Sequence, residues 1–327
     1  MGLDLVKYSK FLVENGVSTL AVATFEEAIK LRKNGIDSEI LLMSPTVDKN
    51  ELVELIENNI TITIGSLAEK KLLEEVISNN EKEVKVQIKI DTGFARYGFL
   101  YYKTDEILEA YSTSCNICYT GIFTHFSNPK DEKWTRTQFN RFNNVIKTLK
   151  ENNINIGCAH CSSSTAFLKY PDMYLDAVRI GSVIQGRVLD NKFDFKKVGV
   201  FKSNIIEIKE LPKGYNISYS NTYKLKKNSK IAVVPVGYYD GLNRNRLRDD
   251  FSFKNNIIAV LMEFKKLFTD NSLRVKIDNV NYKVIGRLGM YHAIIDITDL
   301  NNIDIGTEVI LNITPLQANE EIRREYV

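Results

Sequence analysis

Residues 85–91, KVQIKID, decide the fold, because they predict a short, largely apolar strand between two helices. Working outward, the pattern predicts helices at 66–78 and 103–112, and beyond them strands at 60–64 and 118–125. Strands that alternate with helices pair in parallel, which is typical of an α/β architecture.

The same alternation continues in both directions along the chain. Further helices are predicted at 7–15, 25–34, 48–58, 133–152 and 164–170, and further strands at 18–24, 39–43, 156–161 and 177–183. The strands then number seven, whereas eight would close a barrel. We therefore predict that residues 1–198 form a (β/α)8-type barrel lacking its first strand.

After residue 198 the pattern changes to short strands separated by turn residues, and helical periodicity is nearly absent. Strands are predicted at 203–210, 217–223, 230–236, 257–261, 273–277, 282–285, 293–297 and 308–312. Residues 199–327 are thus expected to form a second, mostly antiparallel all-β domain. A chain of 327 residues suits two domains.

Composition excludes several classes of partner. The chain has 44 basic and 41 acidic residues, a net charge of +3, which is too balanced for nucleic acid to be the main partner. No apolar run is long enough to span a bilayer, and the start lacks a signal-peptide pattern. We therefore expect a cytoplasmic location and no membrane partner.

The four cysteines form two C-x-x-C pairs, Cys115/Cys118 and Cys158/Cys161. The pairs lie further apart than in the usual zinc ribbon. Each lies at the edge of a predicted strand, where residues three apart point to opposite faces. Free thiols and no metal site are expected.

Enzymes with parallel barrels carry their chemistry at the carboxyl ends of the strands. Lys89 shares a strand face with Gln87 and Asp91, so this polar face is either a functional lumen or a solvated edge. His125 ends an apolar run, and a core histidine is the alternative there.

Two further strand ends carry candidates for anion binding. Hydroxyl residues 162–165 precede a predicted helix, and free N–H groups at a helix start bind anions, although ordinary N-capping is the alternative. Arg179 is followed by Gly181, which suggests close approach of the backbone to a ligand.

Seven segments, in the same order and across nearly the whole chain, resemble motifs of the alanine racemase family. They are 89–98 (V-K-x-D-T-G-M-x-R-x-G in the family), 121–126 (G-x-x-T-H-F), 160–166 (H-x-A-N-S-A-A), 176–181 (D-x-V-R-x-G), 217–220 (V-S-Y-G), 234–241 (V-P-x-G-Y-A-D-G) and 284–290 (I-V-G-R-x-C-M).

The resemblance implies a pyridoxal-phosphate enzyme that interconverts L- and D-alanine and so supplies D-alanine. A lysine that holds the cofactor and a tyrosine, matched by Tyr219, exchange the Cα proton on opposite faces. A tyrosine with a pKa near ~10 is a poor base at neutral pH, so a relay is needed. His125 matches the family's partner in that relay.

Other matches concern cofactor and substrate binding. Arg179 matches the arginine that faces the pyridine nitrogen, and Arg96 matches one near the cofactor's phenolic oxygen and the substrate carboxylate. Lys89 matches a lysine often found carbamylated. The remaining matches are Ser164, Gly181 and Ser182 for the phosphate, Met290 for the substrate, and Tyr238, Arg244 and Arg287 for the entrance.

The resemblance also implies a homodimer, because Tyr219 and Met290 reach the partner's active site in this family. The chain departs from the family pattern at Ser163, Gly289, Tyr291, His292 and Gln317. Because these positions rim the substrate pocket, serine or a larger amino acid stays open as the substrate.

The family's cofactor-binding lysine lies in a K-A-N-A-Y-G-H-G motif, and residues 1–3 align with its end. The lysine is thus expected about six residues before Met1. Two readings stay open: a working racemase whose start lies further upstream, or a non-catalytic, decayed racemase-like protein.

Overall fold

The computed structural model describes residues 3–78, 82–112, 116–188, 193–244, 253–266, 268–270, 272–300, 302–319 and 321–326. The chain divides into two compact units. One is Leu5–Val198, the α/β unit, and the other is Gly199–Val327 together with Met1–Asp4, the β unit.

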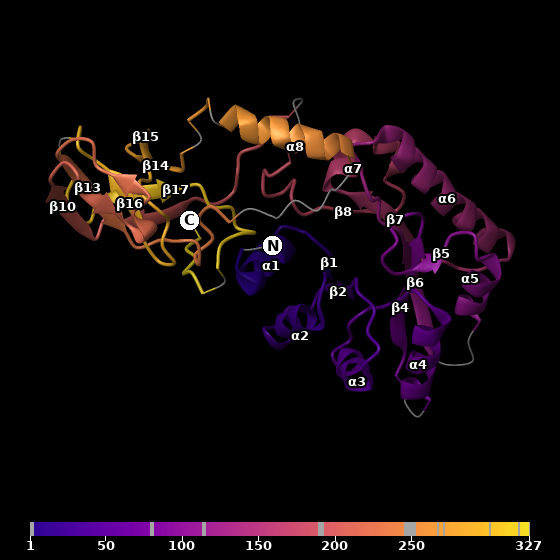
Figure 1. The fold of residues 1–327 in the computed structure, drawn as a ribbon. Helices are drawn as coiled ribbons and strands as arrows, with labels where there is room; N and C mark the ends of the chain where they lie inside the picture. Colours follow the sequence, from indigo (N-terminus) through magenta and orange to yellow (C-terminus); the bar gives the residue numbers. More distant parts are fainter. Residues whose placement is uncertain are drawn as a thin grey trace. The chain divides into compact units, whose positions relative to one another are not determined.

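The α/β unit alternates strands and helices, as the sequence predicts (Figure 1). Its strands are β1 (Thr19–Val22), β2 (Glu39–Leu42), β3 (Ile62–Ile64), β4 (Val84–Asp91), β5 (Phe99–Leu100), β6 (Ile117–Phe123), β7 (Cys158–Ser163) and β8 (Ala177–Arg179). Its helices are α1 (Leu5–Glu14), α2 (Phe25–Lys33), α3 (Lys49–Glu57), α4 (Leu67–Ile77), α5 (Thr104–Tyr111), α6 (Glu132–Glu151) and α7 (Ser164–Lys169), followed by the 3-10 turn η1 (Pro171–Met173).

All strand pairs in this unit are parallel, among the residues described. β1 pairs with β2, a bridge between Leu41 and Thr61 leads on toward β3, and β3, β4, β6, β7 and β8 follow in one sheet. The short β5 pairs with β4. No ladder among these strands joins β8 to β1.

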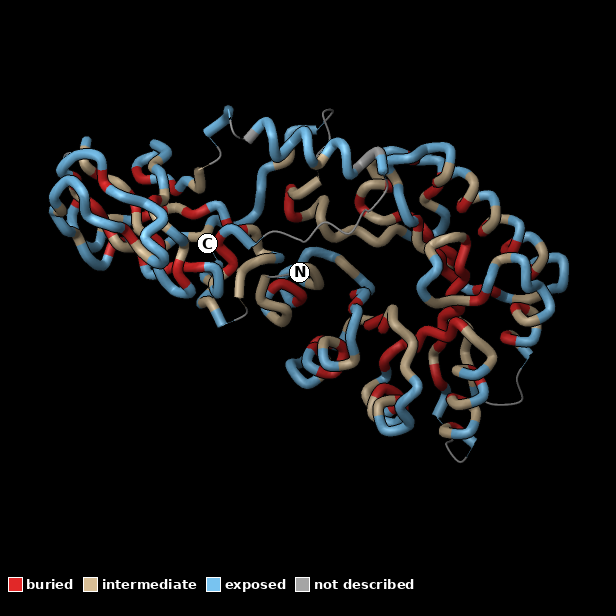
Figure 2. The backbone as a smooth tube through the Cα atoms, viewed as in Figure 1, coloured by how far each residue is buried: buried red, intermediate tan, exposed pale blue. Residues whose placement is uncertain are grey.

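The core of the α/β unit lies between the strands and the helices that surround them, where Figure 2 shows the buried backbone. Ile88 and Ile122 on neighbouring strands and Phe142 on α6 are fully buried there. Local sequence fixes the helix starts: Thr24 and Glu27 form a complete capping box at α2. The carboxyl ends of the strands are thereby held by a rigid scaffold.

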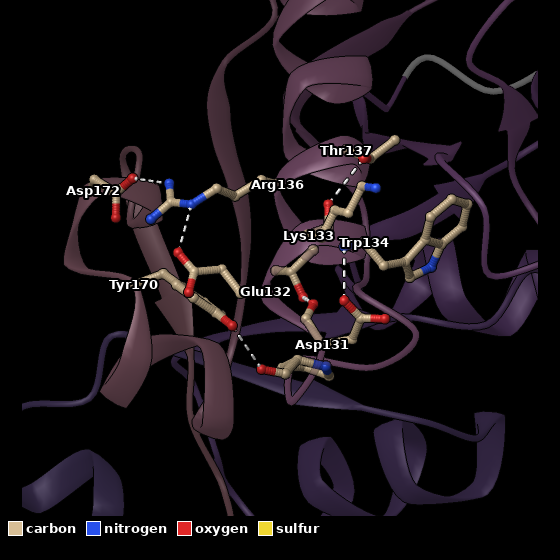
Figure 3. Close-up of polar contacts among 10 residues, drawn as sticks. Asp131, Glu132, Lys133, Trp134, Arg136, Thr137, Tyr170 and Asp172 are labelled. Carbon is tan, nitrogen blue, oxygen red and sulfur yellow. Dashed lines mark hydrogen bonds and ion pairs between the residues drawn. The ribbon is translucent and has the colours of Figure 1, made fainter.

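Helix α6 is anchored firmly at its start (Figure 3). Asp131 accepts a hydrogen bond from the Trp134 N–H at 3.0 Å, which caps the helix. The Arg136 guanidinium joins Glu132 and Asp172, each at 2.9 Å, and so ties α6 to η1.

The β unit contains mostly antiparallel strands. β10 (Glu207–Leu211), β13 (Ser229–Val234) and β16 (Ala293–Asp296) form one sheet. β15 (Val280–Lys283), β14 (Arg274–Ile277), β17 (Glu308–Leu311) and β9 (Phe201–Asn204) form another. The short β11 (Asn216–Ile217) and β12 (Tyr223–Lys224) make a hairpin around the 3-10 turn η2 (Tyr219–Asn221), and α8 spans Phe253–Lys266.

Three predicted strands of the β unit are wrong in detail. Segment 203–210 is two strands, which belong to different sheets. Segment 217–223 is interrupted by η2, where Ser218, Ser220 and Asn221 have positive φ angles that no strand allows.

Segment 257–261 is not a strand but the middle of α8. A short apolar run of this length cannot be assigned by periodicity alone. Phe253, Ile257, Val260 and Phe264 repeat at helical spacing over the longer window, and all four residues are exposed. Figure 2 shows the α8 backbone coloured mostly as exposed.

Candidate active site

The carboxyl ends of β4, β6, β7 and β8 bring together several residues that the sequence singles out. Lys89 lies near the end of β4 and is almost completely buried, at 2% exposure. Its Nζ lies 4.9 Å from the ring centroids of both Tyr97 and Phe123. A lysine that is buried among ring faces is a functional candidate rather than a solvated edge residue.

The charge of Lys89 is strongly disfavoured in this position. Burial, reinforced by the positive charges of Arg179 and Arg96, lowers the pKa of Lys89 to about 7, although Asp91 opposes this shift. The Asp91 carboxylate is itself occupied, because its Oδ1 accepts the N–H groups of Gly93 and Phe94, each at 2.8 Å. The site therefore has a surplus of positive charge beside a lysine that is readily neutral.

Arg179, at the end of β8, is held by five acceptors. It donates to the carbonyls of Thr124 at 2.7 Å, His160 at 3.2 Å and Cys161 at 3.3 Å, and to the Nδ1 atoms of His160 and His125. Burial lowers the pKa of Arg179 to about 10, which leaves the guanidinium charged at neutral pH. Its Nε is buried and has no hydrogen-bond partner among the residues described.

These contacts fix the protonation of both histidines. A guanidinium can only donate, so Nδ1 of each ring must accept and the proton must lie on Nε2. The His160 Nε2–H donates to Gln87 Oε1 at 2.8 Å. Burial and the neighbouring Arg179 lower the pKa of His125 to about 3 and that of His160 well below 6.5, so both rings are neutral.

His125 and Arg96 meet through the ring of Phe94. The rings of His125 and Phe94 pack edge to face at 5.6 Å, and the Arg96 guanidinium lies 4.5 Å from the Phe94 centroid. Arg96 itself is exposed. The loop after β4 and the loop after β6 thereby bring a cation and a neutral imidazole into contact with one ring.

Ser164, at the start of α7, faces the loop after β8. Its Oγ accepts the N–H of Gly181 at 3.0 Å and that of Val183 at 3.4 Å. The Ser164 hydroxyl proton has no acceptor among the described residues. Ser182 lies between these two donors in the chain. The N–H groups of Gly181 and Val183 are thus engaged by Ser164 itself, and the donor that this corner offers to a phosphate is the Ser164 hydroxyl.

The arrangement fits pyridoxal phosphate on two grounds. The unpartnered Nε–H of Arg179 is a buried donor that needs an acceptor, and an unprotonated pyridine nitrogen is one. The Ser164 corner and the positive surplus around Lys89 suit an anionic group. The residues that would hold the cofactor are thus Arg179, Ser164, Gly181 and Ser182.

The β unit carries the remaining candidates at one set of turns. Tyr219 lies in η2 and is 68% exposed. Its segment is strained, because Ser218 has φ 62° and ψ −164°, a conformation that few residues other than glycine adopt. The Ser218 hydroxyl donates to the Arg287 carbonyl, and the Arg287 guanidinium donates to Ser220 Oγ at 3.3 Å, which holds η2 in place.

The turn at 286–292 packs against the turn at 237–244. The N–H of Tyr238 donates to the Gly289 carbonyl at 3.1 Å, and a Cβ on Gly237 would overlap the Met290 carbonyl. Met290 and Tyr238 are both exposed. The structure therefore gathers Tyr238, Arg287 and Met290 close to the turn that presents Tyr219.

Gln317 contacts the turn at 237–244 in the β unit. Its Oε1 accepts from the Thr314 hydroxyl at 3.0 Å, and its Nε2 donates to the Arg244 carbonyl. Where the family motif has a tyrosine, this chain thus uses an amide to fix the segment that carries Arg244.

Cys118, Cys158 and Cys161 are free thiols, and Cys115 lies outside the described residues. In this part of the chain no group of three or more His, Cys, Asp and Glu residues is placed to hold a metal ion. No helix in the described ranges is long and apolar enough to cross a membrane.

The chain is similar to known enzymes over nearly its whole length. It is 34% identical to Alanine racemase 2 of Caldanaerobacter subterraneus subsp. tengcongensis, covering 93% of this chain and 74% of that protein. It is 32% identical to the alanine racemase of Methanococcus maripaludis, covering 94% and 78%. Together with the site, these matches define the class: an isomerase that uses pyridoxal phosphate.

Solved structures and family models agree with this class. The alanine racemase of Clostridium difficile superposes with a TM-score of 0.82 at 29% identity, covering 94% of this chain and 78% of that one. The enzyme from Bacillus anthracis with bound L-Ala-P gives 0.77 at 26%, covering 95% and 75%. The family model "Alanine racemase, N-terminal domain" matches residues 1–187, and "Alanine racemase, C-terminal domain" matches residues 198–325. The chain belongs to the alanine racemase family.

Some residues of the site are not among the sequence candidates. Phe94 links His125 to Arg96, and Gln138 of α6 contacts the loops on which these two residues lie. Gln138 and Thr135 are buried polar residues on a helix that buries apolar residues further along, and nothing in the sequence alone singles out Gln138.

Proposed function

We propose that this protein is a pyridoxal-phosphate racemase that interconverts L- and D-alanine by a two-base mechanism. The observation that carries the proposal is the guanidinium of Arg179, held by backbone carbonyls and two neutral histidines, with its buried Nε–H left free. A donor that stays charged at neutral pH, in this position, suits a pyridine nitrogen that must remain unprotonated.

When bound, pyridoxal phosphate supplies the electron sink that makes the Cα proton of an amino acid acidic. Arg179 would hold the pyridine nitrogen, and Ser164 with the Gly181 and Ser182 backbone would hold the phosphate. Because Arg179 keeps its proton, the sink stays moderate, which limits side reactions. Arg96 would bind the substrate carboxylate, with the Met290 main chain and Tyr238 lining the approach.

Tyr219 would remove or return the Cα proton on one face. His125 Nδ1 is engaged by Arg179, so its Nε2–H is the atom left to donate to the tyrosine oxygen. That donation would stabilise the deprotonated tyrosine. The base on the opposite face is the lysine that the family motif assigns, and no residue within 1–327 is proposed for it.

We further propose that Lys89 is carbamylated, since a lysine with a pKa near 7 presents a neutral amine to CO2. The parallel strands β1, β2, β3, β4, β6, β7 and β8 support seven strands of a (β/α)8 barrel, and the division into compact units supports a domain boundary between 198 and 199. A homodimer in which Tyr219 and Met290 complete the partner's site, and a cytoplasmic location, stay predictions from the family resemblance.

The test is a chiral assay, with pyridoxal phosphate, of the purified protein in a form that includes the lysine that the family motif assigns. L-alanine should give D-alanine and the reverse, with slower turnover of serine. Serine is the alternative substrate, because Gly289, Tyr291 and His292 depart from the family pattern. If serine turns over faster than alanine, serine and not alanine is the substrate. Bound cofactor without inversion of either amino acid would favour the non-catalytic reading.

A further inference from the structure

The N-terminal half of α6 buries polar side chains where a helix of an α/β unit normally buries apolar ones. Thr135 and Gln138 are both fully buried, whereas the later residues on this face are apolar, such as Phe142 and Leu149. Burying an amide is costly unless its donors and acceptors are all satisfied. A specific set of partners must therefore compensate Gln138.

Those partners lie on two different loops. Gln138 Oε1 accepts the Ser127 N–H at 3.0 Å and the Ser127 hydroxyl at 3.1 Å, on the loop after β6. Gln138 Nε2 lies 3.3 Å from Thr92 Oγ1, to which it donates, on the loop after β4. Thr92 Oγ1 is in turn 2.9 Å from Thr124 Oγ1. One amide thus joins the two loops.

Neighbouring side chains of α6 hold the same loops. Arg141 donates to the Thr92 carbonyl at 2.9 Å, and Trp134 Nε1 donates to Ser127 Oγ at 2.8 Å. The backbone approaches so closely that a Cβ on Gly93 would lie 2.8 Å from the Trp134 ring, with a φ of 128° that also requires glycine. The start of α6 also contacts η1 through the exposed ion pair of Arg136 with Asp172 (Figure 3).

The two joined loops carry His125 and Arg96. His125 lies one residue after Thr124 and two before Ser127, and the Phe94 ring that contacts both His125 and Arg96 lies two residues after Thr92. Thr124 also presents its carbonyl to Arg179. A shift of either loop would therefore move the histidine relative to the two arginines.

We propose that Gln138 is a positioning residue: its amide sets the distance between the loop of His125 and the loop of Arg96. The inference rests on the proposed racemase function, because that function assigns catalytic and binding roles to His125 and Arg96 on these two loops. Misplacing a reacting group by about 1 Å costs on the order of 100-fold in rate. A residue that only supported the fold would change stability without changing the rate of the folded enzyme.

The test compares Gln138→Met, which keeps length and volume but cannot donate or accept as the amide does, with Phe142→Leu. Phe142 is equally buried on the same helix but belongs to the apolar core, so its variant should lower the melting temperature and leave kcat unchanged. Well below both melting temperatures, Gln138→Met should lower kcat roughly 10- to 100-fold with little change in KM. Equal kcat for wild type and Gln138→Met would overturn the proposal.

A second pair isolates the link through Thr92. Thr92→Val removes the hydroxyl that accepts from Gln138, and Thr92→Ser retains it. We expect Thr92→Val to lower kcat in the same direction as Gln138→Met, and Thr92→Ser to restore most of it. If the serine and valine variants lose kcat equally, the hydroxyl link is not what positions the loops, and the proposal is overturned.

Amide hydrogen exchange gives a readout that needs no catalysis. Gln138→Met should speed exchange in both loops, 92–98 and 124–128, while Phe142→Leu leaves them as in wild type. Unchanged exchange in both loops would refute the positioning role even if the wild type proved inactive. An inactive wild type whose loops loosen in Gln138→Met would instead refute the racemase function alone.

Discussion

Lys89 offers the sharpest chemical prediction, because its pKa determines how it reacts with CO2. An ordinary lysine has a pKa of 10.5, and burial beside Arg179 and Arg96 lowers that of Lys89 to about 7. At pH 7.5 a large share of the Lys89 side chains is then neutral, whereas an ordinary lysine is almost entirely charged. Only the neutral amine adds to CO2.

The product is also favoured by its surroundings. The Nζ lone pair of the neutral amine bonds to the carbon of CO2 while one C=O π bond opens, one proton leaves Nζ, and a neutral amine becomes an anion. The nearest carboxylate, that of Asp91, is already engaged by two backbone N–H groups. A carbamate would therefore meet unbalanced positive charge from Arg96 and Arg179 and be stabilised by it.

The test compares wild type with Lys89→Gln by 13C NMR, with both proteins in 13C-labelled bicarbonate. At pH 7.5 wild type should show one carbamate resonance in its 13C spectrum, and Lys89→Gln should show none. Lowering the pH to 6, below the Lys89 pKa, should remove most of the wild-type signal. No carbamate in wild type at pH 7.5, or an equal signal in Lys89→Gln, would refute the reasoning.

Three further predictions concern the remaining groups. Tyr219→Phe should slow racemisation by at least ~100-fold while Cα proton exchange in D2O persists for one enantiomer; equal loss for both enantiomers would contradict the two-base mechanism. Arg179→Gln should weaken cofactor binding in an absorbance titration, and wild-type affinity would count against the assigned role. The same variant should lower the free energy of unfolding by roughly 1–3 kcal/mol, because it leaves His160 and buried carbonyls unpaired. Because the pKa values of His125 and His160 are lowered below 6.5, the unfolded chain takes up protons first as the pH falls. The contribution of the two neutral histidines to the free energy of unfolding should therefore be fully present above about pH 6.5. Below that pH it should fall by at most ~1.4 kcal/mol per pH unit for each histidine. Identical urea midpoints at pH 7.5 and 5.5 would refute this.

The sequence predicts the α/β unit well for a physical reason. Its strands are short apolar runs such as 85–91, and each is followed by an amphipathic helix, so that period and length agree. Lys89 stands out because a charged residue inside such a run conflicts with the pattern. Conflicts of this kind concentrate at functional sites, which is why the strand ends could be chosen in advance.

What the sequence does not predict depends on contacts between distant segments. The turn η2 arises because Ser218 and Ser220 are held by Arg287, some seventy residues away, so local propensity reads the segment as one strand. The role of Gln138 depends on contacts between one helix and two loops, and the residue spacing along α6 does not predict that role. Helix α8 reads as a strand because its centre is a run of β-branched and aliphatic residues.

The charges of the site also explain why binding and stability should be linked in this protein. Lys89 and Arg179 are brought together at the strand ends. The carboxylate of Asp91 could balance their charge, but it accepts hydrogen bonds from the turn that begins the Arg96 loop. Like charges in a buried site oppose folding, so any anion that enters it removes part of that cost. A carbamate on Lys89, a phosphate at Ser164 and a substrate carboxylate near Arg96 would be three such anions, and each would stabilise the fold more the more tightly it binds. The same excess of positive charge that would draw the cofactor and the substrate into the site would therefore make the α/β unit depend on them for its full stability.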